Sequence, residues 1–356
     1  MKGLVLAGGS GTRLRPLTYS GAKQLVPVAN RPILFYVLDN LAEAGIRDIV
    51  VIVSPETGRE VETAIGDGSR WQVRVRFVVQ DRPGGLAHAV KIAAPALGDD
   101  DFCMFLGDNL IGTKIRGAAD AFRASPELSA LVMLKEVANP SSFGVAEVND
   151  AGEVERLVEK PAHPRSNLAL VGVYFFRRNV FSAIERIQPS ARGELEITDA
   201  ISELIAEGGR VRFDRVTSWW LDTGKKDDLL LANDTVLDSW LVAETLGVVD
   251  SESKIIGRVR VEPGAKIVRS VVRGPAIIGP DAVITDSRIG PFTSIGAAVR
   301  IQHSVVDRCV LMEGSEVEGI ERLEDSLVGR RVVIRRAPKP GYSLSLLVGD
   351  DCRVEL

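Results

Sequence analysis

A glycine-rich loop near the start of the chain carries the first residues whose types suggest chemistry. The segment at 4–18 reads LVLAGGSGTRLRPLT, so an apolar run leads into glycines and then into Ser10, Thr12, Arg13 and Arg15. Glycine lets backbone N–H groups approach phosphate oxygens, and guanidinium groups neutralise phosphate charge. A tight turn would explain the glycines alone, but the added cations predict a site for an anionic ligand.

The loop matches neither of two common phosphate-binding motifs. A Walker A loop needs a Gly-Lys-Ser/Thr end that is absent here, and the dinucleotide fingerprint needs glycine where Leu14 stands. Lys23 follows within the next turn of sequence and adds a further cation. We therefore expect phosphates to be held by a glycine loop of a different kind.

Two aspartates suit a metal ion. Asp108 directly follows the apolar run at 102–106, and Asp222 follows another short apolar stretch in the sequence LDTG. Open α/β sheets bind ligands at the carboxyl ends of their strands, and two carboxylates from strand ends can hold Mg²⁺ together with waters and phosphate oxygens. Taken alone, a turn at 107–109 and a helix cap at Asp222 would explain both residues equally well.

The elements that must position these residues alternate along the first 230 residues. Short aliphatic runs at 3–7, 48–54, 73–80 and 102–106 predict buried strands, and 32–44 predicts a helix that starts at proline and stops at glycine. This alternation indicates an α/β fold with a Rossmann-like, mixed and mostly parallel sheet that is covered on both faces.

Two further elements depart from the simple alternation. The runs at 145–148 and 154–158 flank Asn-Asp-Ala-Gly, which predicts a hairpin inserted into the α/β pattern. From 225 to about 246 the charged and aliphatic residues fit a helix, which we expect to connect two domains.

The C-terminal part has a different period. Aliphatic residues recur at every sixth position, which fits neither an amphipathic helix nor a strand pair. Such a period predicts a left-handed parallel β-helix of hexapeptide repeats, in which each coil stacks one aliphatic residue per face on the coil below. The segment at 342–356 alternates enough to add a terminal strand or cap. The recurring residues are Val271, Ile277, Val283, Ile289, Ile295 and Ile301.

Composition excludes several classes of protein. The chain has 44 basic and 48 acidic residues, so its formal charge of −4 offers no general attraction to nucleic acid or to anionic lipid. No apolar stretch approaches the ~20 residues that a membrane span requires. Its 3 cysteines form no CxxC pattern, and 3 histidines are too few for a multi-histidine metal centre. We expect a cytoplasmic protein with no disulfide framework.

Seven motifs together resemble one enzyme family. The glycine loop followed by AKQLVPVANRP at 22–32 resembles the signature of the sugar-1-phosphate nucleotidylyltransferases. The remaining motifs resemble its glucose-1-phosphate thymidylyltransferase branch, in the long form that ends in a left-handed β-helix. They are QDRPGGLAHA, FLGDNLIG, FGVAEVNDAGEVERLVEKP, LALVGVYFF, RGELEITD and WWLDTGKKDDLL. The resemblance implies a catalytic domain at 1–240 and a β-helix domain at 241–356.

The implied reaction is attack by glucose 1-phosphate on the α-phosphorus of dTTP, which gives dTDP-glucose and pyrophosphate. The nucleophile needs no general base, because a phosphate monoester with a second pKa of ~6 is largely dianionic at neutral pH. The difficulty is electrostatic, since two anions must meet and the leaving charge must be stabilised. Such a site should be rich in lysine, arginine and a divalent cation, with Mg²⁺ as the cofactor.

The resemblance also assigns residues to roles. Arg13, Lys23 and Lys160 are expected to act in catalysis as fixed cations, and Asp108 and Asp222 as metal ligands. The residues assigned to the nucleotide are Leu6, Gly8, Gly9, Gly11, Thr12, Arg13, Lys23, Gln80, Gly85 and Asp108. Those assigned to the sugar phosphate are Leu86, Asn109, Gly144, Glu159, Lys160 and Val171.

Two of these assignments have a chemical reason. The Gln80 amide can both donate to and accept from the imide edge of thymine, an edge that uracil shares, so relaxed use of UTP would not be surprising. The Glu159 carboxylate can accept two hydrogen bonds from a sugar diol. One departure stands beside them, because His88 replaces the glutamine expected in a GLAQA-like run.

Other functions stay open at this stage. Enzymes of the same class use UTP, GTP or ATP. Hexapeptide β-helices also occur in acyltransferases, whose sites use a histidine, and His303 sits among the predicted coils, although an outward coil residue explains it more simply. We favour a β-helix that serves assembly, and we expect a homo-oligomer.

Overall fold

The computed structural model describes residues 1–9, 11–19, 21–336, 346–350 and 352–355. The chain forms two compact units, one of Met1–Ser10 with Leu34–Asp222 and the other of Gly11–Ile33 with Thr223–Leu356. Within the described ranges, no helix combines the length and the apolar character needed to cross a membrane.

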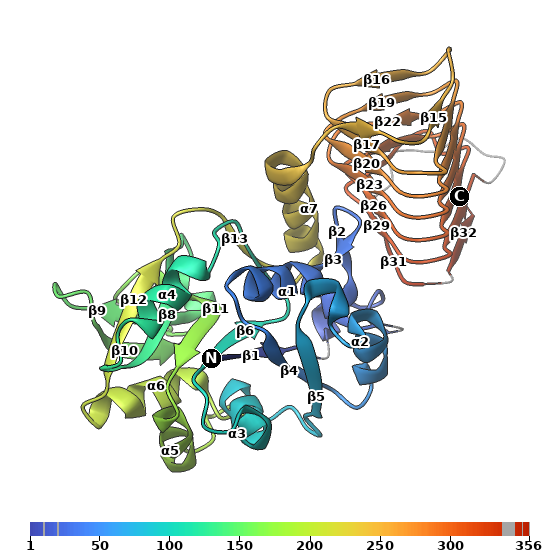
Figure 1. Ribbon diagram of the computed structural model, residues 1–356. Coiled ribbons are helices and arrows are strands. Elements are labelled where there is room, and N and C mark those ends of the chain that lie inside the picture. Colours follow the sequence, from blue (N-terminus) through green and yellow to red (C-terminus); the bar gives the residue numbers. More distant parts are fainter. Residues whose placement is uncertain (10, 20, 337–345, 351, 356) are drawn as a thin grey trace. The chain divides into compact units, whose positions relative to one another are not determined.

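The first unit is built on a nine-stranded sheet with the order β10-β9-β11-β6-β1-β4-β5, and β8 joins it through β11 and carries β12 (Figure 1). The sheet is mixed, as predicted, because β1, β4, β5 and β6 run parallel whereas β11 is antiparallel to its neighbours. The strands are β1 (Lys2–Leu6), β4 (Asp48–Val53), β5 (Arg74–Val79), β6 (Phe102–Leu106), β8 (Leu128–Glu136), β9 (Gly144–Val148), β10 (Val154–Glu159), β11 (Leu168–Phe176) and β12 (Arg210–Arg215).

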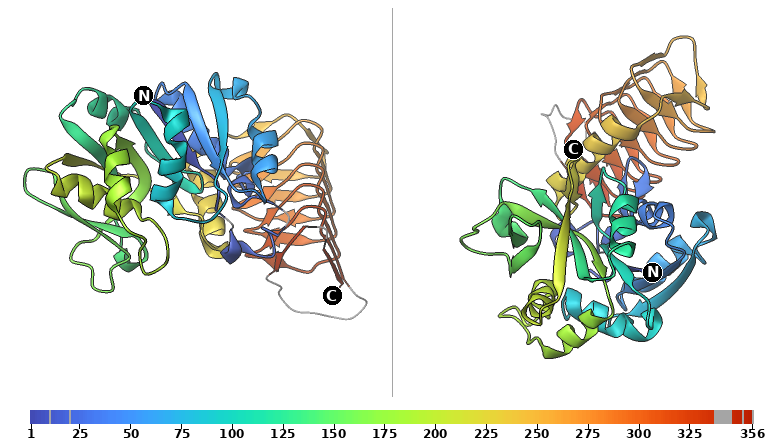
Figure 2. Two further views of the ribbon diagram at one scale, coloured as in Figure 1. Left: turned by 90° about the horizontal axis from the view of Figure 1, so that it is seen from below. Right: turned by 60° about the vertical axis from the view of Figure 1, so that its left-hand side comes forward.

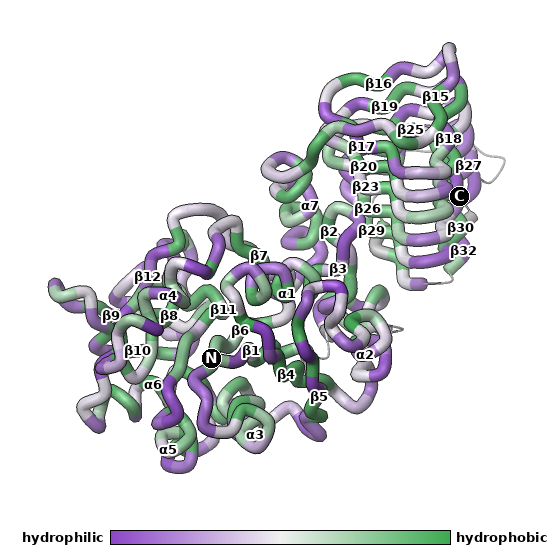
Figure 3. The backbone as a smooth tube through the Cα atoms, viewed as in Figure 1, coloured by the Kyte–Doolittle hydropathy of each residue, from purple (hydrophilic) through white to green (hydrophobic). Residues whose placement is uncertain are grey.

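Helices cover both faces of this sheet, which explains why its central strands are apolar throughout. Figure 3 shows most of β1, β6 and β11 as hydrophobic. On one face, Phe102 of β6 stacks on Phe181 of α5, and α3 and α6 share that core. On the other, Phe122 of α4 packs against Phe175 of β11. The helices are α1 (Ile33–Glu43), α2 (Gly58–Ile65), α3 (Leu86–Leu97), α4 (Arg116–Arg123), α5 (Asn179–Arg186) and α6 (Ile197–Ala206).

The predicted elements of this unit agree closely with the structure. The strand and helix boundaries differ from those expected by one residue at most ends, and the expected hairpin is the antiparallel pair β9 and β10. A second, two-stranded sheet pairs β7 (Asn109–Ile111) with β13 (Trp220–Asp222).

The second unit contains the predicted β-helix, whose coils lie stacked in Figure 2. Its strands form three parallel sheets of seven, seven and five members. Strands of the first sheet begin at residues 259, 276, 293, 310 and 327, so each coil takes 17 residues. That sheet comprises β14 (Glu244–Thr245), β17 (Val259–Val261), β20 (Ala276–Ile278), β23 (Thr293–Ile295), β26 (Val310–Leu311), β29 (Leu327–Val328) and β31 (Leu347–Val348).

The other two sheets complete each coil. The second comprises β15 (Val248–Val249), β18 (Lys266–Val268), β21 (Val283–Thr285), β24 (Arg300–Gln302), β27 (Glu316–Glu318), β30 (Val333–Arg335) and β32 (Arg353–Glu355). The third comprises β16 (Lys254–Ile256), β19 (Val271–Arg273), β22 (Arg288–Ile289), β25 (Val305–Asp307) and β28 (Leu323–Glu324). Strands β31 and β32 confirm that the terminal segment adds strands, although 342–345, 351 and 356 of that segment lie outside the described residues.

The predicted inward positions of the β-helix need a correction. Val272 and Ile284 are fully buried, whereas their neighbours Val271 and Val283, which we expected inside, are only half-buried. Ile277 lies on the opposite face of β20 from the fully buried Ile278. Because each coil has 17 residues, the inward positions advance by six, six and five, and adjacent aliphatic pairs allowed an uninterrupted period of six to fit the sequence.

The connecting helix is shorter than predicted. Helix α7 (Lys226–Trp240) ends six residues before the expected limit at 246, because the chain enters β14 in the first coil of the β-helix. The same unit includes a small hairpin, β2 (Pro27–Val28) and β3 (Arg31–Pro32), whose two turn residues Ala29 and Asn30 have positive φ of 48° and 59°.

Candidate active site

The carboxyl ends of the parallel strands bring three predicted residues to one edge of the sheet. Gly8 follows β1, Gln80 follows β5, and Asp108 follows β6. A Cβ atom on Gly8 would lie 3.4 Å from Gln80 Oε1, so the two residues are in contact. Leu6, the last residue of β1, is buried, and Gly9 beyond it is exposed. Parallel strands align these ends because their register is continuous from β5 through β4 and β1 to β6.

The loop between β5 and α3 is anchored around Gln80. Its Nε2 donates to the Gly85 carbonyl at 3.3 Å and lies 3.0 Å from His88 Nδ1. Gly85 has a φ of +93°, and a Cβ there would lie 2.4 Å from the Leu195 carbonyl oxygen, so no other residue fits. Leu86 begins α3 and is half-buried against the core.

Asp108 and Asp222 lie on adjacent segments. Asn109 and Asp222 are directly paired across β7 and β13, which places Asp108 one residue from that pair. Asn109 is 3% exposed; its Nδ2 donates to Asp108 Oδ1 at 2.9 Å, and its Oδ1 accepts from Trp220 Nε1 at 2.7 Å. In the described part of the chain, no group of three or more His, Cys, Asp or Glu is gathered as a metal site. Two carboxylates leave most of a cation's coordination to other oxygens.

The residues expected to hold the sugar phosphate meet at the end of the β9–β10 hairpin. Glu159 pairs with Gly144, and a Cβ on Gly144 would lie 3.1 Å from Glu159 Oε2. Lys160 Nζ is 3.6 Å from Glu159 Oε1, and the Lys160 backbone is held at a φ of +42° by its N–H, which donates to the Phe143 carbonyl. Burial raises the pKa of Glu159, while Lys160 and Arg192 act in the opposite direction.

Val171, the last predicted sugar contact, is fully buried in β11. It lies within the irregular stretch of β11 between Leu170 and Tyr174, where the pairing with β8 is interrupted. The next residue, Gly172, has a φ of +78°, and a Cβ there would lie 3.2 Å from Asn109 Cγ. This irregularity brings β11 close to the Asn109 end of the site.

The predicted triphosphate ligands lie in the second unit. Lys23 is only 5% exposed, and a Cβ on Gly11, whose φ is +61°, would lie 2.9 Å from Lys23 Cβ. The exposed Arg13 packs against Gly224, where a Cβ would lie 2.9 Å from its Nη2. Thr12 is exposed at the start of a short 3₁₀ turn, η1 (Thr12–Leu14).

Two other residues of this loop complete the comparison with expectation. Arg15 lies over the Tyr19 ring, with its Cζ 4.9 Å from the ring centre. Ser10 lies outside the described residues. Gly11, Thr12, Arg13 and Lys23 are therefore gathered in one short segment of the chain.

Comparison with known proteins agrees with this arrangement. The profile of the family described as "Nucleotidyl transferase" matches residues 2–239. The chain belongs to the nucleotidyl transferase family. A glucose-1-phosphate thymidylyltransferase of Streptomyces griseus is 46% identical over 356 residues, which covers 100% of this chain and 99% of that protein. One from Streptomyces antibioticus is 47% identical with the same coverage.

A solved structure of the family supports the fold of the first part of the chain. It is described as a candidate glucose-1-phosphate thymidylyltransferase from Bacillus anthracis in complex with a sucrose. It is 36% identical, covers 65% of this chain and 94% of its own, and has a TM-score of 0.62. The expected resemblance to a nucleotidylyltransferase is thereby confirmed.

The structure adds one residue to this family site that the sequence motifs had left without a role. Arg192 lies in the motif RGELEITD, and its Nη2 is 3.4 Å from Glu159 Oε1. The buried Glu196 carboxylate accepts from the same guanidinium at 2.8 Å and so orients it. An arginine inside a family motif was the available signal, but its partner Glu159 is 33 residues away along the chain.

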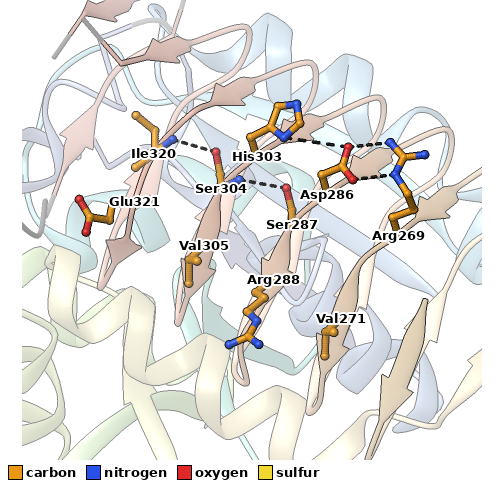
Figure 4. A pocket seen from close by; sticks show the side chains of 10 residues that line it. All are labelled: Arg269, Val271, Asp286, Ser287, Arg288, His303, Ser304, Val305, Ile320 and Glu321. Carbon is orange, nitrogen blue, oxygen red and sulfur yellow. Dashed lines mark hydrogen bonds and ion pairs between the residues drawn. The ribbon is translucent and has the colours of Figure 1, made fainter. Parts of the chain in front are cut away.

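His303 faces outward from the β-helix of this family member. It belongs to an open pocket on the coil surface, where Arg269 donates to Asp286 at 2.6 Å and His303 Nδ1 lies 4.0 Å from the same carboxylate (Figure 4). The His303 side chain is 66% exposed. Below it, the Ser304 N–H donates to Ser287 Oγ at 3.1 Å, which links one coil to the next. The simple reading of His303 as an outward coil residue agrees with this geometry.

Proposed function

We propose that the chain is a glucose-1-phosphate thymidylyltransferase, which transfers a thymidylyl group from dTTP to glucose 1-phosphate and releases pyrophosphate. The observation that carries this proposal is the identity of 46% and 47% over the whole chain to two proteins of that name. The site geometry supports it, because a base-binding amide, two carboxylates and a cluster of sugar-phosphate residues lie in one unit.

The chemistry follows from charge. A non-bridging oxygen of the sugar phosphate attacks the α-phosphorus in line, the new P–O bond forms, and the bond to the β-phosphate oxygen breaks. Lys160 and Arg192, on either side of Glu159, hold the attacking phosphate. Arg13 and Lys23 hold the triphosphate and stabilise the charge of the departing pyrophosphate. Glu159 accepts hydrogen bonds from the sugar hydroxyls.

Asp108 and Asp222 would hold Mg²⁺. Both offer hard oxygen donors, and the β7–β13 pairing places them close together. Bound there, Mg²⁺ would neutralise charge on the phosphate oxygens as a Lewis acid. Asn109 orients Asp108 through its 2.9 Å hydrogen bond, and Trp220 in turn fixes Asn109.

Base selection rests on Gln80 and the thymine methyl group. Gln80 recognises the imide edge that thymine and uracil share, so only a contact with the methyl separates these two bases. A single methyl is worth about 1–3 kcal/mol, and discrimination against UTP should therefore be modest.

We further propose that 1–240 form the catalytic domain and that 241–356 form a β-helix domain for assembly, which makes the protein a homo-oligomer. Strands β14, β15 and β16 are the end members of their sheets, and they carry exposed apolar side chains at Val248 and Ile256. Unpaired strand edges of this kind are readily covered by another chain. Light scattering of the full chain should give a multiple of 38.4 kDa, and Val248→Glu should lower it. A mass of one chain for the unaltered protein would contradict assembly.

The decisive experiment measures initial rates with glucose 1-phosphate, Mg²⁺ and each of dTTP, UTP, GTP and ATP. We expect dTTP to give the highest kcat/KM, with UTP next. A tenfold preference for UTP, GTP or ATP would assign the chain to a sister activity. Asp108→Asn and Asp222→Asn should each abolish Mg²⁺-dependent turnover while the unfolding temperature stays close to that of the wild type.

A further inference from the structure

His88 stands where the family resemblance leads us to expect glutamine, and its ring is held in a defined place. It lies in the first turn of α3, and a Cβ on Gly84 would be 2.7 Å from both Cγ and Nδ1 of the ring. Gly84 itself is fixed, because its carbonyl accepts from the Leu195 N–H at 2.8 Å. The imidazole therefore packs directly on backbone that cannot move easily.

The hydrogen bonds around Gln80 determine which way its amide points. One amide atom faces the Gly85 carbonyl at 3.3 Å, and because a carbonyl can only accept, that atom must be the nitrogen. The same nitrogen lies 3.0 Å from His88 Nδ1. Its two hydrogens thus have two acceptors, provided that His88 is neutral and carries its proton on Nε2.

The orientation of the nitrogen leaves the Gln80 oxygen for the ligand. Oε1 points toward Gly8, where a Cβ would lie only 3.4 Å away. Gly8 follows β1 at the carboxyl edge of the sheet, on the side expected for the base. The site therefore presents a fixed acceptor, which suits the N3–H donor of thymine or uracil. Cytosine places an acceptor at N3, so it would meet this oxygen with repulsion.

We propose that His88 is a specificity-determining positioning residue, which locks the Gln80 amide so that its oxygen reads the N3–H group of the base. This inference rests on the proposed thymidylyltransferase function. It concerns a residue that contacts Gln80 and not the base, so its effect should be on the choice between bases and not on the phosphoryl transfer itself.

The lock should fail when His88 is protonated, because both ring nitrogens then donate and Nδ1–H would face the Gln80 N–H. Burial lowers the pKa of His88, and the nearby Arg82 and Lys91 lower it further while Asp81 opposes them. Lys91 is itself paired with Glu185 of α5 at 2.9 Å. The neutral ring is thus favoured at neutral pH, and the change falls in the acid range below the ordinary histidine pKa of ~6.5.

The test compares kcat/KM for dTTP, dCTP and dUTP in the wild type, His88→Phe and His88→Gln. Ratios between triphosphates cancel the titration of the phosphates and of the sugar phosphate. We expect His88→Phe, which has no acceptor, to lower the dTTP/dCTP ratio about tenfold. The dTTP/dUTP ratio should not change, since both bases share the imide edge. His88→Gln, whose amide oxygen can accept from Gln80, should restore the dTTP/dCTP ratio.

The pH dependence supplies an independent readout. In the wild type the dTTP/dCTP ratio should fall as the pH drops below ~6, whereas in His88→Gln it should stay constant. An unchanged ratio in a folded His88→Phe, or the same acid loss in His88→Gln as in the wild type, would overturn the proposal. Should His88→Phe not fold, the pH profiles of the other two proteins decide. Failure of the proposed function would be seen separately, as a wild type that prefers another triphosphate to dTTP.

Discussion

Asn233 of α7 accepts a 2.6 Å hydrogen bond from the Ser294 hydroxyl of β23, and both side chains are fully buried. The same Asn233 oxygen accepts from the Ala29 N–H at 3.0 Å, and its Nδ2 donates to the Phe292 carbonyl at 2.9 Å. One amide thus joins the turn of the β2–β3 hairpin to a coil of the β-helix. Asn30 adds a second link, from its Nδ2 to the Ile295 carbonyl. The segment that carries Lys23 is therefore supported by the β-helix within one compact unit.

Replacing Asn233 with leucine should destabilise the protein by about 2–4 kcal/mol, because three buried polar groups lose their partner. The free energy of unfolding from urea titration measures this. Ser239→Ala, at an exposed position of the same helix, is the control and should stay within about 0.5 kcal/mol of the wild type. Equal stability of Asn233→Leu and the control would show that the buried amide does not support the hairpin.

Gly11→Ala should impair turnover by more than its cost in stability suggests. An added Cβ would approach Lys23 Cβ to 2.9 Å and so displace a proposed catalytic cation, in addition to the strain of a φ of +61°. Gly208→Ala is a matched control, since Gly208 has a φ of +82° with no atom within 4 Å of the added Cβ. We expect both to lose about 1–2 kcal/mol in stability, but only Gly11→Ala to lose kcat/KM for dTTP, by tenfold or more. Similar kinetics for the two variants would remove Gly11 from the site.

Lys160→Met should lower kcat/KM for glucose 1-phosphate by roughly 10²–10³, the usual cost of removing one charged donor from a phosphoryl-transfer site. Steady-state kinetics at saturating dTTP measure this loss. Lys114→Met removes an exposed lysine that pairs with Glu43, and it should leave these constants unchanged. Retained activity in Lys160→Met would exclude Lys160 as the cation that holds the sugar phosphate.

Glu159→Gln should reduce use of the sugar phosphate but not stability at neutral pH. Burial raises the folded-state pKa of Glu159, so its ionised form is penalised on folding. Between the unfolded pKa and the raised folded pKa, the folded state binds more protons than the unfolded state, and stability falls as the pH rises. The penalty is complete above the folded pKa and absent below the unfolded one.

The comparison of Glu159→Gln with the wild type should therefore depend on pH. The variant should gain stability relative to the wild type as the pH is raised from about 4 to 7, and thermal unfolding across that range measures the difference. A relative loss at higher pH would mean that the ion pairs of Glu159 with Lys160 and Arg192 outweigh its burial.

Local sequence determined the elements of this protein and most of the chemistry it carries. Apolar runs such as the one at 102–106 became buried strands within one or two residues of the expected limits, because burial on both faces requires such runs. The motifs pointed to Gly8, Gln80 and Asp108 at strand ends, where parallel register aligns them. These properties depend on residues close together in the chain.

Tertiary structure decided what depends on distant residues. The pairing of Asn109 with Asp222 joins segments more than a hundred residues apart, and the contact of Arg192 with Glu159 joins two motifs with separate local patterns. The inward register of the β-helix followed the 17-residue coil and not the period of six, since the stacking of one coil on the next selects which member of each aliphatic pair is buried. Hydrophobic period alone cannot choose between two adjacent aliphatic residues, and only packing against the neighbouring coil makes that choice.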